Sequence, residues 1–268
     1  MEKTEFEQIQ SQLEKYQFSS LTYAEYEEVE TYKIICKTPE LILILGYNPE
    51  AKQQEYHWAA NNPQELIKKL TEQDCFVTFI PHEWVKKMET AGFKIRNAWH
   101  DYFMESLENV KESKTKYPFL QQNECEEAAE VTVACRGDSR GFTGQTKEWF
   151  QEWIGEKEGF AQNRVVLTER NEKGKIIGLV CAGTYGNAGG TGKIAWIREV
   201  GVRPEYRNQG IARKLITQAL WYGKCHGAVK AFLAADEQNY RAIHLYESIG
   251  FKASVEESQI DMIKSNVK

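Results

Sequence analysis

The stretch RNQGIAR, from Arg207 to Arg213, lies between an apolar run typical of a strand and an apolar-periodic run typical of a helix. The first turn of a helix leaves backbone N–H groups without partners, and the helix dipole adds about half a positive charge there. Gly210 lets the backbone come close to a bulky phosphate, and the two arginines add charge at the rim. The stretch therefore favours an anion site. A solvated loop that uses glycine for turn geometry is the alternative left open.

A second motif, N-x-x-A-x-x-x-Y-x-x-x-G-F, covers residues 239–251. Together with V-x-P-x-x-R-x-x-G-x-A at residues 202–212, it resembles the GNAT superfamily of acyl-CoA-dependent N-acyltransferases. The resemblance is close from residue 175 to residue 251, and the order of elements from residue 117 onward agrees with it. It implies an α/β fold with a mixed α+β sheet. It also implies an N-acetyltransferase that uses acetyl-CoA and no metal.

The resemblance assigns cofactor contacts to individual residues. The backbone of Val200, Gly201 and Val202 is expected to pair with the pantetheine arm, with Gly201 letting the thioester lie close. Asn239 matches the asparagine that holds this arm, and Tyr246 matches the tyrosine near the departing sulfur. The pyrophosphate is expected to bind the loop amides, which belong to Asn208, Gln209, Gly210, Ile211, Ala212 and Arg213.

The acceptor amine must lose a proton before it can attack a thioester. An alkylamine with a pKa near 10.4 loses it at a cost of about 4 to 5 kcal/mol at neutral pH, and a peptide α-amine at a cost of only about 1 kcal/mol. Glu199, on the strand beside the expected thioester position, is the candidate base, acting directly or through a water. A strand glutamate that faces solvent is the alternative.

Tyr246 can assist the leaving sulfur in two ways. Full proton transfer from a phenol near pKa 10 to a thiolate near 8.5 runs uphill by about 2 kcal/mol unless the site shifts either value. Hydrogen-bond stabilisation of the sulfur is therefore at least as plausible as transfer. A core tyrosine on the inner helix face is the alternative without chemistry.

Two domains are expected to position these residues: 1–112, and a catalytic domain at 117–268, joined by the charged segment 108–116. Asn123 with Glu126 has the form of a capping box that begins a helix, and Thr146 begins another that carries Trp149 and Trp153. The expected strands of the chain are 32–37, 41–46, 56–60, 75–80, 93–104, 117–120, 165–170, 175–184, 193–202 and 229–235. The other expected helices are 62–70, 84–91, 209–223 and 240–249.

The two halves share a weak internal repeat. METAGFKI at residues 88–95 matches YESIGFKA at residues 246–253, and the preceding strands also match. The first half nevertheless places Met88 opposite Tyr246, and it has no R-x-x-G-x-A sequence before its helix at Asn62. We expect a degenerate GNAT-like N-terminal half that does not hold CoA and instead shapes the acceptor cleft or an interface, which leaves the oligomeric state open.

The composition excludes several classes of protein. A net charge of −5 over 268 residues argues against binding to nucleic acid, which depends mainly on Lys and Arg. The acidic N-terminus and the lack of a long apolar run predict a cytoplasmic protein without a membrane segment. The six cysteines and five histidines show no metal-ligand spacing, and we expect the cysteines to act as small buried hydrophobes.

Other functions stay open at this stage. A non-enzymatic CoA-binding sensor or interaction module would keep the cofactor site without acceptor chemistry. A nucleotide site at GNAGGTGKI, residues 186–194, lacks the first glycine of a P-loop, where Asn187 stands, and its Ser or Thr, where Ile194 stands, so a flexible hairpin turn is the better interpretation. The acceptor amine, whether a small molecule or a protein amine, cannot be identified from the sequence.

Overall fold

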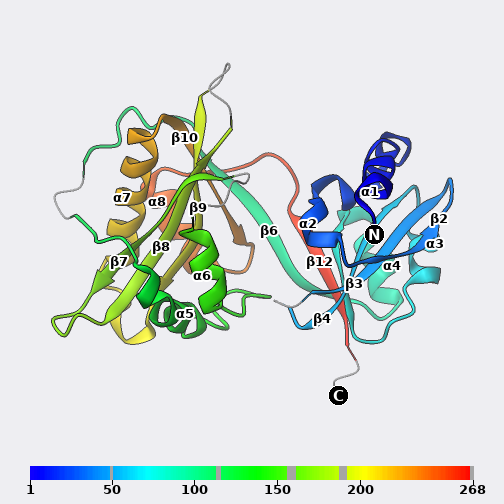
Figure 1. Cartoon of the computed structure of the whole chain (residues 1–268), viewed down its shortest axis with the longest axis horizontal. Coiled ribbons are helices and arrows are strands. Elements are labelled where there is room, and N and C mark those ends of the chain that lie inside the picture. Colours follow the sequence, from blue (N-terminus) through cyan, green and yellow to red (C-terminus); the bar gives the residue numbers. More distant parts are fainter. Residues whose placement is uncertain (49–50, 113–115, 156–160, 187–191, 266–268) are drawn as a thin grey trace. The chain divides into compact units, whose positions relative to one another are not determined.

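The computed structural model describes residues 1–48, 51–112, 116–155, 161–186 and 192–265. The chain forms two compact units (Figure 1). Unit 1 contains Met1–Trp99 and Glu257–Lys268, and unit 2 contains His100–Glu256.

Unit 1 is a sheet with helices on it. Its strand order is β2-β3-β4-β5-β12-β6, and all neighbours are antiparallel except β4 and β5, which run parallel. Residues of the apolar run in β3 alternate between two hydrophobic clusters, which explains why the run is continuous. The main elements are α1 (Lys3–Gln10), α2 (Tyr26–Val29), β2 (Lys33–Lys37), β3 (Leu41–Asn48), β4 (Gln53–Ala60), α3 (Pro63–Lys69), β5 (Cys75–Ile80), α4 (His82–Thr90), β6 (Lys94–Met104) and β12 (Gln259–Lys264), with the short β1 (Phe18–Ser19) beside β4.

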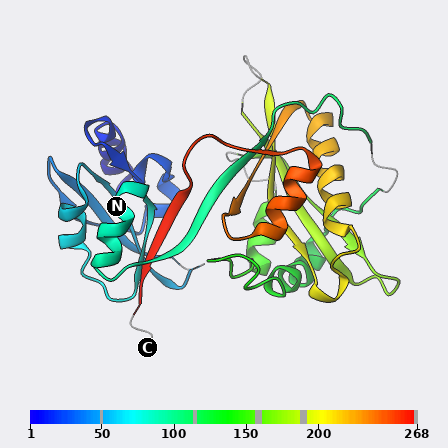
Figure 2. The same ribbon diagram turned by 180° about the vertical axis from the view of Figure 1, so that it is seen from behind.

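Unit 2 has helices on both faces of its sheet. The strand order is β7-β8-β9-β10 followed by β6, with β9 and β10 parallel. Helices α5 and α6 pack on one face (Figure 1), and α7 and α8 pack on the other (Figure 2). The elements are α5 (Cys125–Val133), α6 (Lys147–Trp153), β7 (Gln162–Arg170), β8 (Ile176–Tyr185), β9 (Lys193–Val202), α7 (Ile211–Cys225), β10 (Ala228–Asp236), α8 (Tyr240–Ile249) and β11 (Lys252–Ala253).

Strand β8 and helix α7 form the centre of unit 2. Every residue of β8 except the last is buried, which fits its apolar sequence IIGLVCAGTY. Helix α7 buries one stripe at helical spacing, and at Gly223 it approaches β9 so closely that an added Cβ would lie 2.4 Å from the Cβ of Ala195. This close packing holds the C-terminal end of α7 against the sheet.

Each unit contains strands that pair although they are distant in sequence. The C-terminal strand β12 lies between β5 and β6 in unit 1, where Ile260 and Met262 are buried. The second half of β6 belongs to unit 2, where Tyr102 and Phe103 pair with β11. Both sheets are therefore completed by segments distant in sequence.

The compact units divide the chain differently from the expected linker at 108–116. Strand β6 runs through the boundary at Trp99 and His100, and the last residues return to unit 1. Residues 113–115 of that expected linker lie outside the described residues. The expected domain limits 1–112 and 117–268 thus differ from the limits of the compact units. Nothing local in the sequence indicates that the last strand, β12, returns to pair in unit 1.

The mixed α/β class is confirmed, and most expected elements exist with small differences at their ends. Residues 117–120 are not a strand: Phe119 forms only an isolated bridge with Leu167, since Pro118 has no N–H to donate. The capping box also lies earlier than expected, at Gln121 and Glu124. Strand β12 was not expected. Of the hairpin turn at residues 186–194, residues 187–191 lie outside the described part of the chain.

None of the described helices combines the length and the apolar character needed to cross a membrane. Four of the six cysteines are buried, as expected for small hydrophobic residues; Cys36 is half-buried and Cys225 is exposed. Within the described ranges, no group of three or more His, Cys, Asp or Glu side chains could hold a metal ion.

Candidate active site

The parallel strands β9 and β10 pair only over their first halves. Their register ends with Phe232 opposite Trp196, although β9 continues to Val202 and β10 to Asp236. Both strands are fully described, and no further pair joins them over these ranges. Strand β9 keeps its pairs with β8 as far as Val202, so its alternate backbone groups point away from β8, toward the side of β10. The two strands therefore separate at residues 200–202.

Gly201 of β9 lies against α5, on the face of the sheet opposite α7. A Cβ added there would be 3.4 Å from Cγ1 of Val131 and 3.6 Å from Sγ of Cys135. These are ordinary contacts, but they leave little room for a longer side chain beneath α5. The structure therefore supplies a packing reason for this glycine in addition to its expected closeness to a thioester.

The loop before α7 ends in a helix N-terminus with no cap. Asn208 and Gly210 adopt φ angles of 61° and 76°, and Gly210 is the N-cap residue without a side-chain hydrogen bond. No backbone N–H from Asn208 to Arg213 has a partner among the residues that the structure describes, and residues 208–210 are exposed. Six consecutive donors at the positive end of a helix dipole form a site for an anion.

Three contacts hold this loop on the sheet. The side chain of Arg203 is buried, and its guanidinium donates to the carbonyl of Ile176 at 2.9 Å and to Glu130 at 3.0 Å. Gly178 on β8 makes room for the first residue of α7, because an added Cβ would lie 2.9 Å from Cγ2 of Ile211. Sequence reasoning missed both residues, since their partners are distant in sequence.

The two arginines expected at the rim already have partners. Arg207 donates from Nε to the carbonyl of Val202 at 3.1 Å and forms a two-point ion pair with Asp138. Arg213 donates to the carbonyl and the hydroxyl of Ser248, at the end of α8. Both side chains thus fix the anion site to its surroundings.

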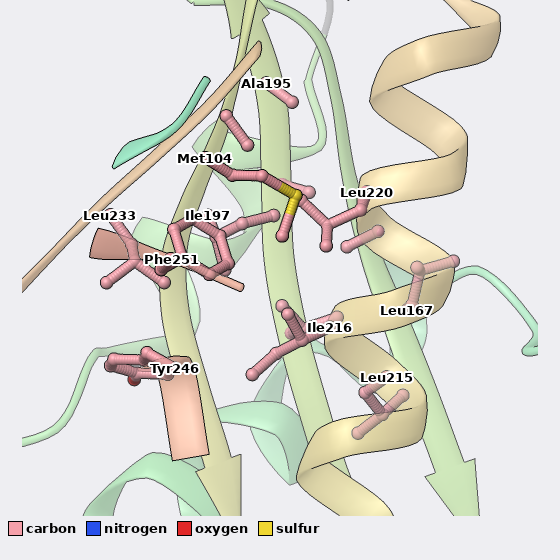
Figure 3. Packing of buried hydrophobic residues seen from close by; sticks show 14 of the residues in the cluster. Met104, Leu167, Ala195, Ile197, Leu215, Ile216, Leu220, Leu233, Tyr246 and Phe251 are labelled. Atoms are coloured by element: carbon pink, nitrogen blue, oxygen red, sulfur yellow. The ribbon is translucent and has the colours of Figure 1, made fainter. Parts of the chain in front are cut away.

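Asn239 and Tyr246 lie on α8, which follows β10. Asn239 caps this helix by accepting a hydrogen bond from the N–H of Ala242 at 3.3 Å, and its amide nitrogen has no partner in the described part of the chain. Tyr246 is 9% exposed, and its ring centroid lies 6.3 Å from that of Phe251. It belongs to the same buried cluster as Ile197 of β9 and Leu233 of β10, which lie beside Phe251 (Figure 3). The expected tyrosine is therefore on the inner face of α8 and close to both separating strands.

Burial, and secondly the charge of Glu199, raise the pKa of Tyr246 above its ordinary value. The hydroxyl makes no hydrogen bond with any residue that the structure describes. The phenol is therefore neutral at physiological pH and can donate to a ligand.

Glu199 follows a bulge in β9. Glu199 lies opposite Cys181 and Ile197 lies opposite Ala182, so Arg198 is the extra residue. The carboxylate accepts a hydrogen bond from Nε2 of Gln145 at 2.9 Å, and it is half-buried. Glu199 therefore lies close enough to Tyr246 for its charge to raise the pKa of that tyrosine. The hydrogen bond with Gln145 connects Glu199 to the loop before α6.

The loop from Gly137 to Gln145 contacts both separating strands. Gln145 reaches Glu199 on β9, and Arg140 forms an ion pair with the buried Asp236 of β10 at 3.0 Å. Ser139, in the same loop, has a buried hydroxyl without a partner among the described residues. This loop thus lies at the strand separation.

Unit 1 contains the same strand and helix arrangement without the anion site. Helix α3 follows β4 almost at once, its N-cap Asn62 accepts from the N–H of Glu65, and Pro63 has no N–H. Between the parallel strands, Trp58 of β4 donates its indole N–H to the carbonyl of Thr78 in β5 at 2.9 Å. The positions that are open in unit 2 are filled by side chains in unit 1.

Similar proteins support this description of unit 2. Residues 134–251 match the family model described as "Acetyltransferase (GNAT) family". Mycothiol acetyltransferases from Thermobispora bispora and Stackebrandtia nassauensis are 36% and 32% identical over 86 and 92 residues, which are 32% and 34% of this chain. The matched segments span only 28% and 29% of those relatives' length.

Two solved structures share the fold over most of the chain. A GCN5-related N-acetyltransferase from Sphaerobacter thermophilus has a TM-score of 0.55 at 16% identity, over 84% of this chain and 76% of that one. A Drosophila protein has a TM-score of 0.52 at 11% identity, over 98% of this chain and 86% of that one. The strand separation, the uncapped helix and the family match agree in identifying residues 134–251 as a domain of the acetyltransferase (GNAT) family.

Proposed function

We propose that unit 2 transfers an acetyl group from acetyl-CoA to a primary amine. The observation that carries this proposal is the run of backbone donors from Asn208 to Arg213 beside the separated strands β9 and β10. The donors suit a pyrophosphate, and the separated strands leave backbone groups for an extended pantetheine arm. The matched relatives are acetyltransferases, which supports acetyl as the transferred group.

The residues of the anion site and the strand separation would hold the co-substrate. Val200, Gly201 and Val202 would pair with the arm, and the unpartnered amide nitrogen of Asn239 would donate to it. Arg207 and Arg213 would add charge at the rim while they keep their present partners. Unit 1, with its capped helix and its Trp58, would not bind CoA in this way.

Glu199 and Tyr246 would perform the proton chemistry. Glu199 accepts a proton from the ammonium form of the acceptor, and the neutral amine attacks the thioester carbonyl carbon. The C–N bond forms, the C–S bond breaks, the nitrogen releases its second proton to solvent, and the sulfur leaves as a thiolate beside the Tyr246 hydroxyl. Because the pKa of Tyr246 is raised, full transfer of its proton is more unfavourable than for an ordinary phenol. Its part is therefore to donate a hydrogen bond to the sulfur.

A covalent intermediate on cysteine does not fit this site. Cys181, opposite Glu199, is fully buried, and burial followed by the charge of Glu199 raises its pKa well above the usual value. A thiol that stays protonated is a poor nucleophile. We therefore propose direct attack by the amine.

A thiol-release assay with acetyl-CoA and a panel of amines tests the proposed function. Turnover with any amine, with the acetylated product identified by mass spectrometry, supports it. Tight binding of CoA by calorimetry without turnover on any amine would instead favour a CoA-binding sensor. ATP binding that CoA does not displace would favour a nucleotide-binding enzyme.

Replacing Gly210 with leucine is expected to raise the KM for acetyl-CoA by about tenfold or more and to leave the KM for the amine nearly unchanged. The larger residue would stand where the pyrophosphate approaches the backbone, and the φ angle of 76° strains any side chain by about 1 kcal/mol or more. Steady-state kinetics with each substrate varied in turn measures both constants.

Gly174→Leu is the matched control for Gly210→Leu. Gly174 has a φ angle of 79°, and like Gly210 it has nothing within 4 Å of an added Cβ, but it lies in the β7–β8 turn. This variant should lose similar stability without any change in the KM for acetyl-CoA. Equal rises in both Michaelis constants of Gly210→Leu would refute the assignment of the anion site.

Replacing Tyr246 with phenylalanine is expected to lower kcat by about 10- to 100-fold, which is the value of one hydrogen bond to a developing charge. The KM for acetyl-CoA and the melting temperature should change little, because the hydroxyl has no protein partner in the described residues. The neighbouring Tyr240→Phe, an exposed tyrosine on α8, is the control. An unchanged kcat in Tyr246→Phe would show that the tyrosine serves packing alone.

A further inference from the structure

The side chain of Arg198 lies among three tryptophans. Its guanidinium carbon is 5.1 Å from the ring centroid of Trp149, 5.4 Å from that of Trp153 and 5.1 Å from that of Trp196. Trp149 and Trp153 are stacked, with centroids 5.4 Å apart and an interplanar angle of 6°, and Trp196 meets Trp153 edge to face. Three aromatic rings therefore restrict the position of one cation.

This arginine is next to the proposed base. Arg198 is the bulged residue of β9, and Glu199 follows it directly. The two side chains contact the same segment of chain: Gln145 bonds Glu199, and Trp149 and Trp153 of α6 hold Arg198. A positive and a negative group are thus presented together at the edge of the strand separation.

The guanidinium of Arg198 keeps its hydrogen-bonding capacity. It is exposed, and it forms no ion pair or hydrogen bond with any residue in the described part of the chain. Contact with ring faces stabilises the cation without using its N–H donors. An immobilised guanidinium also loses less conformational entropy when it binds a planar anion.

We propose that Arg198 binds a carboxylate on the acceptor, so that the substrate class is amines that also carry a carboxylate. The proposal rests on the proposed acetyl transfer and extends it to the acceptor. The planar fork of the guanidinium matches a carboxylate in a two-point hydrogen bond, and its single charge matches a monoanion. Glu199 would receive the ammonium group of the same molecule, so the acceptor would be a zwitterion in solution.

Two other occupants of this site fit less well. A cationic or aromatic acceptor would need the faces of Trp149, Trp153 and Trp196, and Arg198 already lies over all three rings. An acceptor that lacks an anionic group would leave the Arg198 guanidinium hydrogen-bonded only to water. Such an acceptor would gain no binding energy from the position of Arg198. Packing of α6 on the sheet explains the stacking but not why Arg198 has no anionic partner among the described residues.

Matched pairs of acids and their amides test the proposal. Glycine with glycinamide, β-alanine with β-alaninamide and 4-aminobutyrate with 4-aminobutanamide vary the distance between amine and carboxylate. For each acceptor, kcat/KM of Arg198→Ala is divided by that of the wild type, so that the pKa of the amine cancels. We expect kcat/KM of Arg198→Ala to be about 30- to 100-fold lower than that of the wild type for the preferred acid, as for loss of a charged hydrogen bond. For the matching amide, the two values should agree within about twofold.

The control variant is Arg164→Ala. Arg164 also lies over Trp153, at 5.9 Å, but it donates to the carbonyl of Gly155. It should show no difference between acids and amides, whereas Arg198→Lys should retain part of the preference for the acid. The KM for acetyl-CoA should be unchanged in all three variants.

The outcomes separate this proposal from the proposed function. Equal losses for acids and amides in Arg198→Ala would overturn the carboxylate assignment while acetyl transfer stands. If no amine in the panel is acetylated although acetyl-CoA binds, the proposed function itself fails, and the assignment of Arg198 fails with it.

Discussion

Replacing Glu199 with glutamine is expected to lower kcat/KM for an alkylamine by about 100- to 1,000-fold at neutral pH, the usual contribution of a general base. The carboxylate would no longer remove the proton whose loss costs an alkylamine about 4 to 5 kcal/mol. Gln145, which now donates to the carboxylate at 2.9 Å, can donate equally well to the amide oxygen of glutamine, so the local structure should be preserved. The KM for acetyl-CoA should therefore not change.

The size of the Glu199→Gln defect should depend on the acceptor and on pH. An amine with a pKa near 8 is already partly neutral, so its kcat/KM should fall by about tenfold or less. For an alkylamine, kcat/KM of the variant should rise with pH toward the amine's own pKa and so reduce the difference from wild type. Glu172→Gln, an exposed glutamate in the β7–β8 turn, is the control. A loss independent of amine pKa and pH would contradict the role of Glu199 as a base.

The uncapped helix start at Gly210 could be predicted from sequence because its parts are local. Gly210, the residues around it and the apolar periodicity of the helix lie within one short stretch, and unsatisfied N–H groups are a property of every uncapped helix start. The same holds for the end of α8, where Gly250 adopts a φ angle of 117°. Short-range chemistry of this kind is visible without knowledge of the fold.

The surroundings of the site could not be predicted, because they depend on distant pairs. Gln145 meets Glu199, Arg140 meets Asp236, and the sequence places no signal at either pair. Arg207 illustrates the limit, since its charge suggests a phosphate ligand but the fold gives it Asp138 as a partner. The position of Arg198 among three tryptophans likewise required the bulge in β9 and the stacking of α6.

The repeat shows how two similar halves can differ in function. Both contain a parallel strand pair that ends early and a helix that follows the first strand of that pair. Unit 2 keeps the helix start uncapped, whereas unit 1 has Asn62 and Pro63 there and Trp58 across the strands. We therefore expect a few side chains at one place to decide whether this arrangement can bind an anion.

Removing residues 257–268 is expected to unfold unit 1 while leaving every residue of unit 2 in place. Strand β12 supplies hydrogen bonds to β5 and β6 at once, and Met262 and Ile260 are 0% and 3% exposed. Losing either buried side chain costs about 2 to 5 kcal/mol, and a whole domain is stable by only about 5 to 15 kcal/mol. Asp261, which bonds Asn97 and the N–H of Phe79, would be lost as well. Hydrogen exchange should therefore show that β5 and β6 lose protection.

A peptide with the sequence of residues 257–265, added in trans, should restore protection in β5 and β6, because an open sheet position accepts a strand of matching pattern. The control peptide carries Ile260→Ser and Met262→Ser, which keep the backbone donors and remove the apolar face; it should not restore protection. Retained protection of β5 and β6 in the truncated chain would contradict the prediction. In that case β5 and β6 would be stable without β12, and the strand order of unit 1 could not be the source of its stability.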